Sequence, residues 1–155
     1  MGSETLGLDF DGVLRKWPGF IGWYANFLKP NDILVRTRLF RLRRILNYFF
    51  MDCTPIILDG ELIEEIKKYN PSRIIVVSGR CLDNQKDQVV RCLSPFLNID
   101  RFYFREDCLE REEKFKERIL RKEKVTFYLE DRDFVVKYLR SKGIRTYHIS
   151  DIRGG

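Results

Sequence analysis

Two aspartates near the start of the 155-residue chain, Asp9 and Asp11, are separated by one phenylalanine and followed by Gly12. They come after a short apolar run, and beyond the end of a strand the backbone can turn both carboxylates toward one point. One carboxylate could then attack a phosphorus atom while the other delivers a proton to the leaving oxygen. Aspartate and glycine are also ordinary turn residues, so the motif alone fits a plain strand-to-turn connection nearly as well.

A second polar cluster, Ser78-Gly79-Arg80, ends another apolar run. A hydroxyl and backbone N–H groups near a helix start can bind phosphoryl oxygens, and an arginine can hold two of them at once. Glycine lets the backbone approach a ligand closely. These residue types favour a phosphate-binding loop, and the alternative is a surface loop whose arginine is merely solvated.

The third cluster is the acidic pair Glu130 and Asp131, which follows a further apolar run. Acids that leave a buried strand cost desolvation free energy unless a cation is near. Magnesium prefers oxygen ligands, and Asp9, Asp131 and a backbone carbonyl near Asp11 would suit it. The alternative is an acidic pair that caps the helix beginning at Asp133.

Short apolar runs alternate with helical patterns along the chain, and each cluster stands where an apolar run ends. This alternation predicts an α/β domain with a Rossmann-like, doubly wound sheet of five parallel strands and helices on both faces. Ligands bind such sheets at the carboxyl ends of the strands, where the three clusters would meet. We expect strands at 6–10, 73–77, 101–104, 125–129 and 145–149, and helices at 60–69, 84–93, 110–121 and 133–141, the last ended by Gly143.

Residues 15–54 interrupt this pattern and differ in composition from the rest of the chain. They contain eight basic and two acidic residues, which accounts for the whole net charge of +6, and nine of the 21 aromatic residues. We therefore predict a core domain formed by 1–14 and 55–155, with 15–54 inserted as a small, mainly helical cap. An apolar stripe typical of an amphipathic helix runs through it at Val35, Leu39, Leu42, Leu46 and Phe49.

The length fits one domain with one insertion, and a composition of 44% hydrophobic and 34% charged residues excludes a disordered chain. The net charge of +6 favours an anionic partner. Neither a secretory signal nor an apolar run of about eighteen residues is present, so we expect a cytoplasmic protein that does not cross a membrane. The four cysteines lack metal-ligand spacing and are expected to be reduced, and the single histidine, His148, is expected to be structural.

The order of the motifs resembles that of the haloacid dehalogenase-like (HAD) phosphotransferase superfamily. Its pattern is Asp-x-Asp-Gly-Val, a strand that ends in serine, a lysine, and an acidic pair after an apolar strand. The resemblance covers residues 5–14 and 55–150. It implies a magnesium-dependent phosphatase in which Asp9 attacks the phosphoryl group and forms an aspartyl-phosphate intermediate. Asp11 would protonate the leaving group and then activate the water that hydrolyses the intermediate.

The same resemblance implies roles for the remaining polar residues. A lysine would balance the charge of the nucleophile and the substrate. Lys116 is the expected lysine because it stands at the head of a helical run, and Lys114 is the competing choice. The implied phosphate-binding residues are Ser78, Gly79, Arg80, Arg105 and Lys116, and the implied metal ligands are Asp9, Asp11, Asp131 and Glu130.

The second half of the chain is similar to the 3′-phosphatase domain of phage-type polynucleotide kinase-phosphatases and to the HAD domain of RNA repair proteins. In the first of these families the matching arginines contact the substrate phosphate, which points to Arg80 and Arg105 here. The chain departs from the family in three ways. It has a glutamate at position 130 where the family usually has aspartate, it lacks a Walker-type kinase lobe, and residues 15–54 have no counterpart. The similarity is carried by residues 78–80, 105–107, 116–120 and 130–136.

These resemblances predict a phosphoric monoester hydrolase whose favoured substrate is a 3′-phosphate end of a polynucleotide, DNA or RNA. A basic, aromatic-rich cap fits a nucleic acid, since arginines neutralise phosphates and aromatic rings stack on bases. The alternative substrate is a small phosphorylated metabolite or a lipid phosphate, with the amphipathic helix lying on an anionic membrane surface. The apolar stripe could also pack against the core or against a second subunit of a homo-oligomer.

Overall fold

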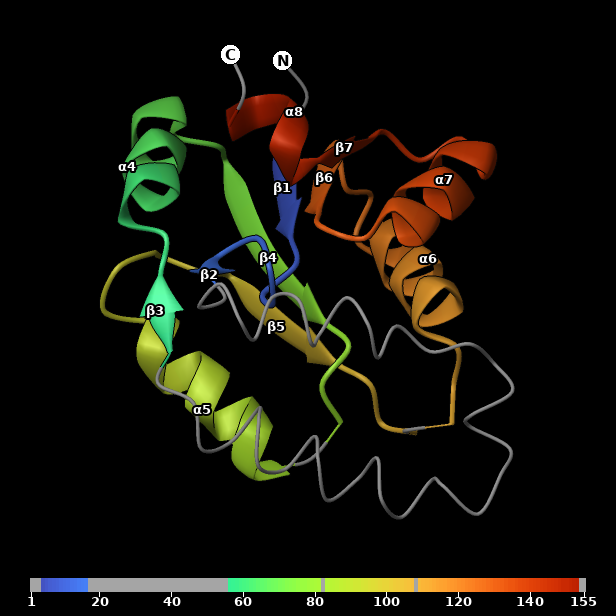
Figure 1. The fold of residues 1–155 in the computed structure, drawn as a ribbon, viewed down its shortest axis with the longest axis horizontal. Coiled ribbons are helices and arrows are strands. Elements are labelled where there is room, and N and C mark those ends of the chain that lie inside the picture. The colour runs from blue at the N-terminus through green and yellow to red at the C-terminus, as the bar shows by residue number, and fades with distance from the viewer. Residues whose placement is uncertain (1–3, 17–55, 82, 108, 154–155) are drawn as a thin grey trace. The chain divides into compact units, whose positions relative to one another are not determined.

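The computed structural model describes residues 4–16, 56–81, 83–107 and 109–153, and its main element is a five-stranded sheet (Figure 1). The strand order is β5-β4-β1-β6-β7, and every neighbouring pair is parallel. This confirms the predicted doubly wound α/β sheet, in which each parallel pair needs a crossover connection. The strands are β1 (Thr5–Leu8), β4 (Arg73–Ser78), β5 (Arg101–Phe104), β6 (Phe127–Glu130) and β7 (Thr146–His148).

Helices flank the sheet on both faces (Figure 1). They are α4 (Gly60–Tyr69), α5 (Asp83–Leu93), α6 (Glu112–Lys122), α7 (Asp133–Ser141) and the short α8 (Ile149–Arg153). Alternate side chains of β4 point to the face covered by α6 and α7, because successive strand residues face opposite sides. The resulting core consists of Ile75, Val77, Phe115, Ile119, Leu120, Tyr128, Val135 and Leu139.

Local sequence explains where α4 begins and ends. The Asp59 carboxylate accepts a hydrogen bond of 3.3 Å from the backbone N–H of Leu62, which satisfies one of the free donors of the first turn. Leu62 and Ile66 are buried and lie one turn apart, so they share the face that packs on the sheet. The helix ends where Asn70 adopts a left-handed backbone conformation with φ of 50°.

The expected boundaries agree closely with the structure. The helices α4 and α7 span the predicted residues, α5 begins one residue earlier, and α6 spans 112–122 instead of 110–121. Strand β1 ends at Leu8 rather than at residue 10, because the chain turns there into the loop that carries the second aspartate. The sequence predicts neither α8 nor the two-residue strands β2 (Arg15–Lys16) and β3 (Ile57–Leu58), because these elements are too short to show a periodic pattern.

The chain divides into two compact units, residues 1–15 with 58–155 and residues 16–57. The first unit contains the five-stranded sheet and the helices named above. The predicted cap, residues 15–54, begins with the two described residues of β2, and its remaining residues 17–54, with the apolar stripe, lie outside the described residues. Within the described ranges, no helix is both long and apolar enough to cross a bilayer.

One expectation about the cysteines is wrong. Cys81 is disulfide-bonded, whereas Cys92 is a free thiol. Chain spacing could not reveal the bond, because pairing depends on the distance and direction that the fold gives to two side chains.

Candidate active site

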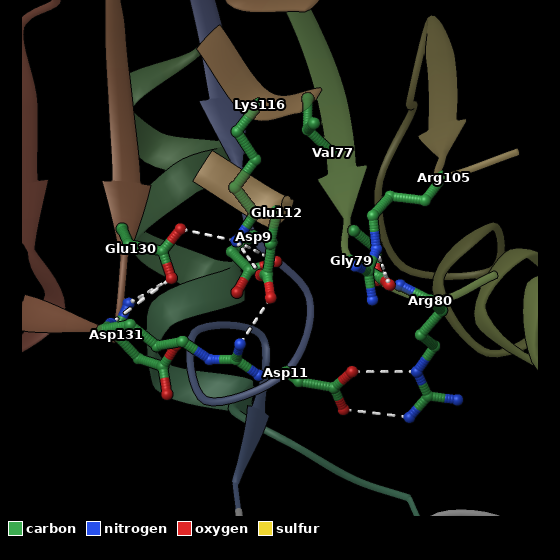
Figure 2. A network of polar contacts seen from close by, with 12 residues as sticks. Asp9, Asp11, Val77, Gly79, Arg80, Arg105, Glu112, Lys116, Glu130 and Asp131 are labelled. Carbon is green, nitrogen blue, oxygen red and sulfur yellow. Dashed lines mark hydrogen bonds and ion pairs between the residues drawn. The ribbon is translucent and has the colours of Figure 1, made fainter. Parts of the chain in front are cut away.

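Three neighbouring strands end at the same place (Figure 2). Asp9 follows β1, Ser78 is the last residue of β4, and Glu130 is the last residue of β6. The backbone N–H of Asp9 donates a 3.0 Å hydrogen bond to the carbonyl of Leu129, which fixes the start of the loop after β1 against β6. The polar clusters of the sequence therefore meet at the carboxyl end of the sheet.

Lys116 lies among the carboxylates at this point. Its Nζ is 3.3 Å from Asp9 Oδ1, 2.7 Å from Glu112 Oε1 and 2.6 Å from Glu130 Oε2, and its side chain is fully buried. Glu112 is in contact because residues four apart share one face of a helix. Lys114 is exposed, so the geometry favours Lys116 as the lysine of the site.

Burial and charge shift the pKa values in this cluster. Burial alone would lower the pKa of the Lys116 ammonium, but Asp9 and the two glutamates around it raise that pKa well above its ordinary value. The pKa of Asp9 is also raised well above its ordinary value, mainly by burial and next by the charge of Glu130. Lys116 therefore stays protonated, and an ionised Asp9 needs positive charge beyond that lysine.

A candidate metal site lies beside the lysine. Asp9, Glu130 and Asp131 each offer one carboxylate oxygen, and these oxygens lie within 4.8 Å of one another. The Oδ1 atom of Asp131 is buried and has no hydrogen-bond partner among the described residues. Burial and then the charge of Asp9 raise the pKa of Asp131 to about 6. An all-oxygen donor set with close like charges and an unsatisfied buried oxygen fits a hard divalent cation such as Mg²⁺.

The two acids of the pair differ in what their oxygens contact. Glu130 Oε2 accepts a hydrogen bond from Lys116, and Oε1 accepts from the backbone N–H groups of Asp131 (3.2 Å) and Arg132 (3.3 Å). Burial raises the pKa of Glu130 to about 7, although Lys116 opposes the shift. Because both Glu130 oxygens are already engaged, the geometry favours Asp131 as the direct metal ligand.

The loop after β1 is tightly closed and requires a glycine. The backbone N–H of Arg15 donates to the carbonyl of Phe10 at 2.9 Å, and that of Gly12 donates to the carbonyl of Arg15 at 3.0 Å. Gly12 has a φ of +85°, which other residues rarely adopt. A Cβ atom at this position would lie 2.0 Å from Asp131 Oδ2. The turn and the position of Asp131 therefore both depend on the absence of a side chain here.

Arg80 holds the second aspartate, Asp11, through a paired contact (Figure 2), and Arg15 lies near the same carboxylate. Arg80 Nε and Nη2 donate to the two oxygens of Asp11 at 2.8 and 2.9 Å, and Arg15 Nη1 lies 3.4 Å from Asp11 Oδ1. Burial would raise the pKa of Asp11, but Arg80 and then Arg15 lower it below its ordinary value. The structure does not bring the Asp11 carboxylate into the group formed by the other three acids, although the sequence resemblance counts it among the metal ligands.

The remaining predicted phosphate-binding residues surround the end of β4. Ser78 is buried, and its hydroxyl oxygen accepts a 3.3 Å hydrogen bond from the backbone N–H of Arg80. Arg105 Nε donates to the carbonyl of Gly79 at 2.6 Å, and Nη1 donates to the carbonyl of Glu110 at 2.8 Å. In this arrangement Arg105 braces the loop after β4 against the segment before α6.

Two charged residues that the sequence did not assign complete the cluster. The carboxylate of Glu112 accepts hydrogen bonds from both Arg132 and Lys116. Burial would raise the pKa of Glu112, but Arg132 and then Lys116 lower it. A Cβ atom on Gly79 would lie 2.7 Å from Glu112 Cδ, so α6 begins directly against the end of β4. The four-residue spacing of Glu112 and Lys116 was the one available sequence signal, and nothing in the sequence linked Glu112 to Arg132.

His148 contacts the backbone of the acidic loop. The Ser150 N–H lies 3.2 Å from His148 Nδ1, which therefore accepts, so the ring proton belongs on Nε2. Nε2 lies 2.6 Å from the carbonyl oxygen of Asp131 and donates to it. His148 therefore contacts the backbone of a candidate metal ligand, Asp131.

Comparisons with known proteins identify the fold. No family model and no curated protein matches the chain. A haloacid dehalogenase-like hydrolase, SP0104 from Streptococcus pneumoniae, superposes with a TM-score of 0.65 at 10% sequence identity, covering 92% of this chain and 82% of that chain. The chain has the HAD fold. A second hydrolase, from Streptococcus pneumoniae TIGR4, gives a TM-score of 0.58 at 14% identity and covers 99% of this chain and 98% of that one.

A component of the Pnkp1/Rnl/Hen1 complex has the same HAD fold, with a TM-score of 0.63 at 19% identity. The comparison covers 94% of this chain but 45% of that one, so the HAD-like chain spans less than half the length of this relative. At such low identities the likeness establishes the fold of a HAD-type hydrolase.

Proposed function

We propose that this HAD-like chain is a magnesium-dependent phosphatase that hydrolyses a phosphomonoester through an aspartyl-phosphate intermediate on Asp9. The observation that carries the proposal is the environment of the Asp9 carboxylate. It is buried after the central strand, with the Lys116 ammonium at 3.3 Å and oxygens of Glu130 and Asp131 within 4.8 Å. A carboxylate so placed is rigidly held and can become a nucleophile once its charge is balanced.

The charges of the cluster support a divalent cation. The cluster contains four carboxylates and two basic groups, so two negative charges remain when all are ionised, and one cation of charge +2 would neutralise them. Asp9 and Asp131 would hold Mg²⁺ directly, and Glu130 would orient Lys116. When bound, Mg²⁺ would stabilise the negative charge on the phosphoryl oxygens. The charged residues counted are Asp9, Glu112, Glu130, Asp131, Lys116 and Arg132.

The proposed reaction has two displacements at phosphorus. In the first, a carboxylate oxygen of Asp9 bonds to phosphorus and the ester P–O bond breaks. The departing oxygen takes a proton from Asp11, which must first take up that proton from solvent because Arg80 and Arg15 keep it ionised in the free protein. In the second, Asp11 takes a proton from water while the water oxygen bonds to phosphorus. The bond between phosphorus and Asp9 then breaks and inorganic phosphate leaves. Lys116 stabilises the negative charge beside Asp9 in both steps.

The favoured substrate is a 3′-phosphate end of DNA or RNA. Residues 15–54 carry eight basic residues and nine aromatic ones, which suits the phosphates and bases of a polynucleotide. A relative with this fold is a component of an RNA repair complex, which supports the same substrate class. The phosphatase chemistry itself does not depend on this choice, because Asp9 and Lys116 act on the phosphoryl group alone.

A substrate panel with Mg²⁺ tests the proposal. Oligonucleotides with 3′- or 5′-phosphates, sugar phosphates and phosphatidate would be compared by phosphate release. We expect the fastest hydrolysis with 3′-phosphorylated oligonucleotides, and loss of hydrolysis in Asp9→Asn. Asp83→Asn is the matched control, since Asp83 lies 95% exposed on α5 and pairs only with Lys86 among the described contacts. Full activity in Asp9→Asn would exclude the mechanism, whereas hydrolysis of small phosphates alone would exclude the nucleic-acid substrate.

A further inference from the structure

We propose that Asp11 and the substrate phosphoryl group compete for the guanidinium of Arg80, which we call the Arg80 latch. Asp11 occupies the guanidinium when no phosphate is present, and an arriving phosphate takes its place and releases Asp11 toward the leaving group. The inference rests on the phosphatase function proposed above and adds to it a positioning role for Arg80 and Arg15.

The two guanidinium nitrogens of Arg80 that could bind a phosphate in a paired contact already bind Asp11. Nε and Nη2 form the fork that binds carboxylate or phosphate oxygens in pairs, and in this structure both donate to Asp11, at 2.8 and 2.9 Å. The opposite nitrogen, Nη1, donates to Gln88 Oε1 at 3.3 Å. A phosphoryl group can therefore gain the paired contact with this fork only if Asp11 leaves it.

The contacts indicate that Asp11 is the partner that moves. The Arg80 side chain is 2% exposed, its guanidinium carbon lies 5.0 Å from the centre of the Phe10 ring, and Gln88 holds its far end. These contacts fix the guanidinium independently of Asp11. Asp11 has a short side chain on a tight loop, and rotation about its side-chain bonds is sufficient to break both hydrogen bonds.

Arg15 makes this exchange energetically feasible. A buried carboxylate that loses its partner is strongly destabilised. The Arg15 guanidinium lies 3.4 Å from Asp11, and its side chain is fully buried. Asp11 therefore retains a positive neighbour when phosphate takes Arg80. The loop hydrogen bond from the Arg15 N–H to the Phe10 carbonyl, at 2.9 Å, keeps the two residues together.

The latch lies where a phosphoryl group would arrive. Arg80 follows β4, the strand next to β1 in the sheet, and its backbone N–H donates to the hydroxyl of Ser78. On the other side, a cavity of about 450 Å³ is lined by residues of α5 that include Gln88, the residue bonded to Arg80. The cavity thus adjoins the residue that holds the far end of the guanidinium, and the exchange would free Asp11 only when a substrate is bound.

A double-mutant cycle with inorganic phosphate tests the latch. Phosphate affinity is measured by titration calorimetry in the presence of Mg²⁺ for the wild type, Asp11→Asn, Arg80→Gln and the double variant. If Asp11 occupies the latch about nine-tenths of the time, removing its charge tightens phosphate binding about tenfold. In the Arg80→Gln background, Asp11→Asn changes phosphate affinity by less than about twofold, because the guanidinium for which Asp11 and phosphate compete is absent.

The other outcomes overturn the proposal. If Asp11→Asn tightens phosphate binding equally with and without Arg80, Asp11 acts only by its charge. If Asp11→Asn does not tighten phosphate binding in the wild-type background, Asp11 does not compete with phosphate. Arg118→Gln, a matched loss of one exposed guanidinium, leaves the effect of Asp11→Asn unchanged. Thermal unfolding of each variant excludes misfolding as the cause. If Asp11→Asn changes phosphate affinity equally with and without Arg80, and the protein still hydrolyses phosphomonoesters, the latch is wrong but the phosphatase function stands. If the protein neither binds phosphate nor hydrolyses phosphomonoesters, both proposals are wrong.

Discussion

A single lysine side chain balances three carboxylates at the end of the sheet. Lys116 could be chosen from the sequence because of its place in the motif order, but its contacts with Asp9, Glu112 and Glu130 could not. Those contacts join residues from β1, α6 and β6, which only the fold brings together. The types of the candidate site residues could thus be predicted from the sequence, and their pairing could not.

Substitutions of Lys116 and Lys114 should show which of the two lysines belongs to the site. We expect Lys116→Met to lower kcat by about 100-fold or more, because the charge beside Asp9 is lost in the transition state. We also expect it to destabilise the metal-free fold by roughly 3 kcal/mol, because buried carboxylates lose their cation. Lys114→Met, at an exposed position of the same helix, is the control for both kinetics and urea unfolding. Loss of activity in Lys114→Met with retention in Lys116→Met would reverse the assignment.

The acidic cluster predicts an unusual dependence of stability on pH. In the metal-free fold the pKa of Glu130 is raised from 4.5 to about 7 and that of Asp131 from 3.8 to about 6. At a pH between the ordinary and the raised pKa values, the folded protein binds more protons than the unfolded chain. The free energy of unfolding therefore falls as pH rises from about 4 to about 7. Mg²⁺ binds the ionised folded form and should reverse the trend. Unfolding temperatures measured across this range with EDTA and with Mg²⁺ check both signs, and a rise in stability with pH in EDTA would contradict the account.

The histidine on β7 should affect the metal through the backbone. His148→Ala removes the hydrogen bond from Nε2 to the carbonyl of Asp131, and we expect Mg²⁺ affinity to fall about tenfold, as for other groups that orient ligands. His148→Gln can still donate to that carbonyl and should restore most of the affinity. Calorimetric titration of Mg²⁺ measures both variants. Equal affinity in the alanine variant and the wild type would remove the positioning role.

At the scale of elements, periodicity and helix stops were sufficient to predict four helices and the five strands of the sheet. The 3.6-residue pattern of α4 and the position of Gly143 after α7 are local features, so their boundaries could be read directly. The loop from Asp9 to Arg15 could not be predicted, since its shape depends on three contacts. These are two backbone hydrogen bonds and the close approach of Gly12 to Asp131.

That loop gives a test at the level of the element. Gly12→Ala places a Cβ atom where the carboxylate of Asp131 lies and forces a φ of +85° on an alanine. We expect Mg²⁺ affinity and activity each to fall at least about tenfold, with a loss of stability of about 1 kcal/mol or more. Gly60→Ala, in a position with open space around it, is the matched control and should leave the metal affinity unchanged. Wild-type Mg²⁺ affinity in Gly12→Ala would show that the contact does not set the position of Asp131.

At the scale of the whole molecule, the HAD fold turns three scattered sequence motifs into one site. The strand order puts β1 between β4 and β6, so Asp9, Ser78 and Glu130 emerge from adjacent strands at the same edge. The fold class could be predicted because the alternation of strands and helices extends over the core. The net charge of +6 is carried by residues 15–54, whereas the acidic cluster of the candidate site lies at the carboxyl end of the sheet.

The most direct test of the account is to trap the phosphoryl group on the enzyme. A 3′-phosphorylated oligonucleotide is mixed with the Mg²⁺-loaded protein, the reaction is quenched in acid within one turnover, and the peptides are examined by mass spectrometry. We predict one phosphoryl group on Asp9 in the wild type and none in Asp9→Asn. Phosphate release at the full rate with no modified peptide, or with the phosphoryl group on another residue, would contradict the proposed nucleophile.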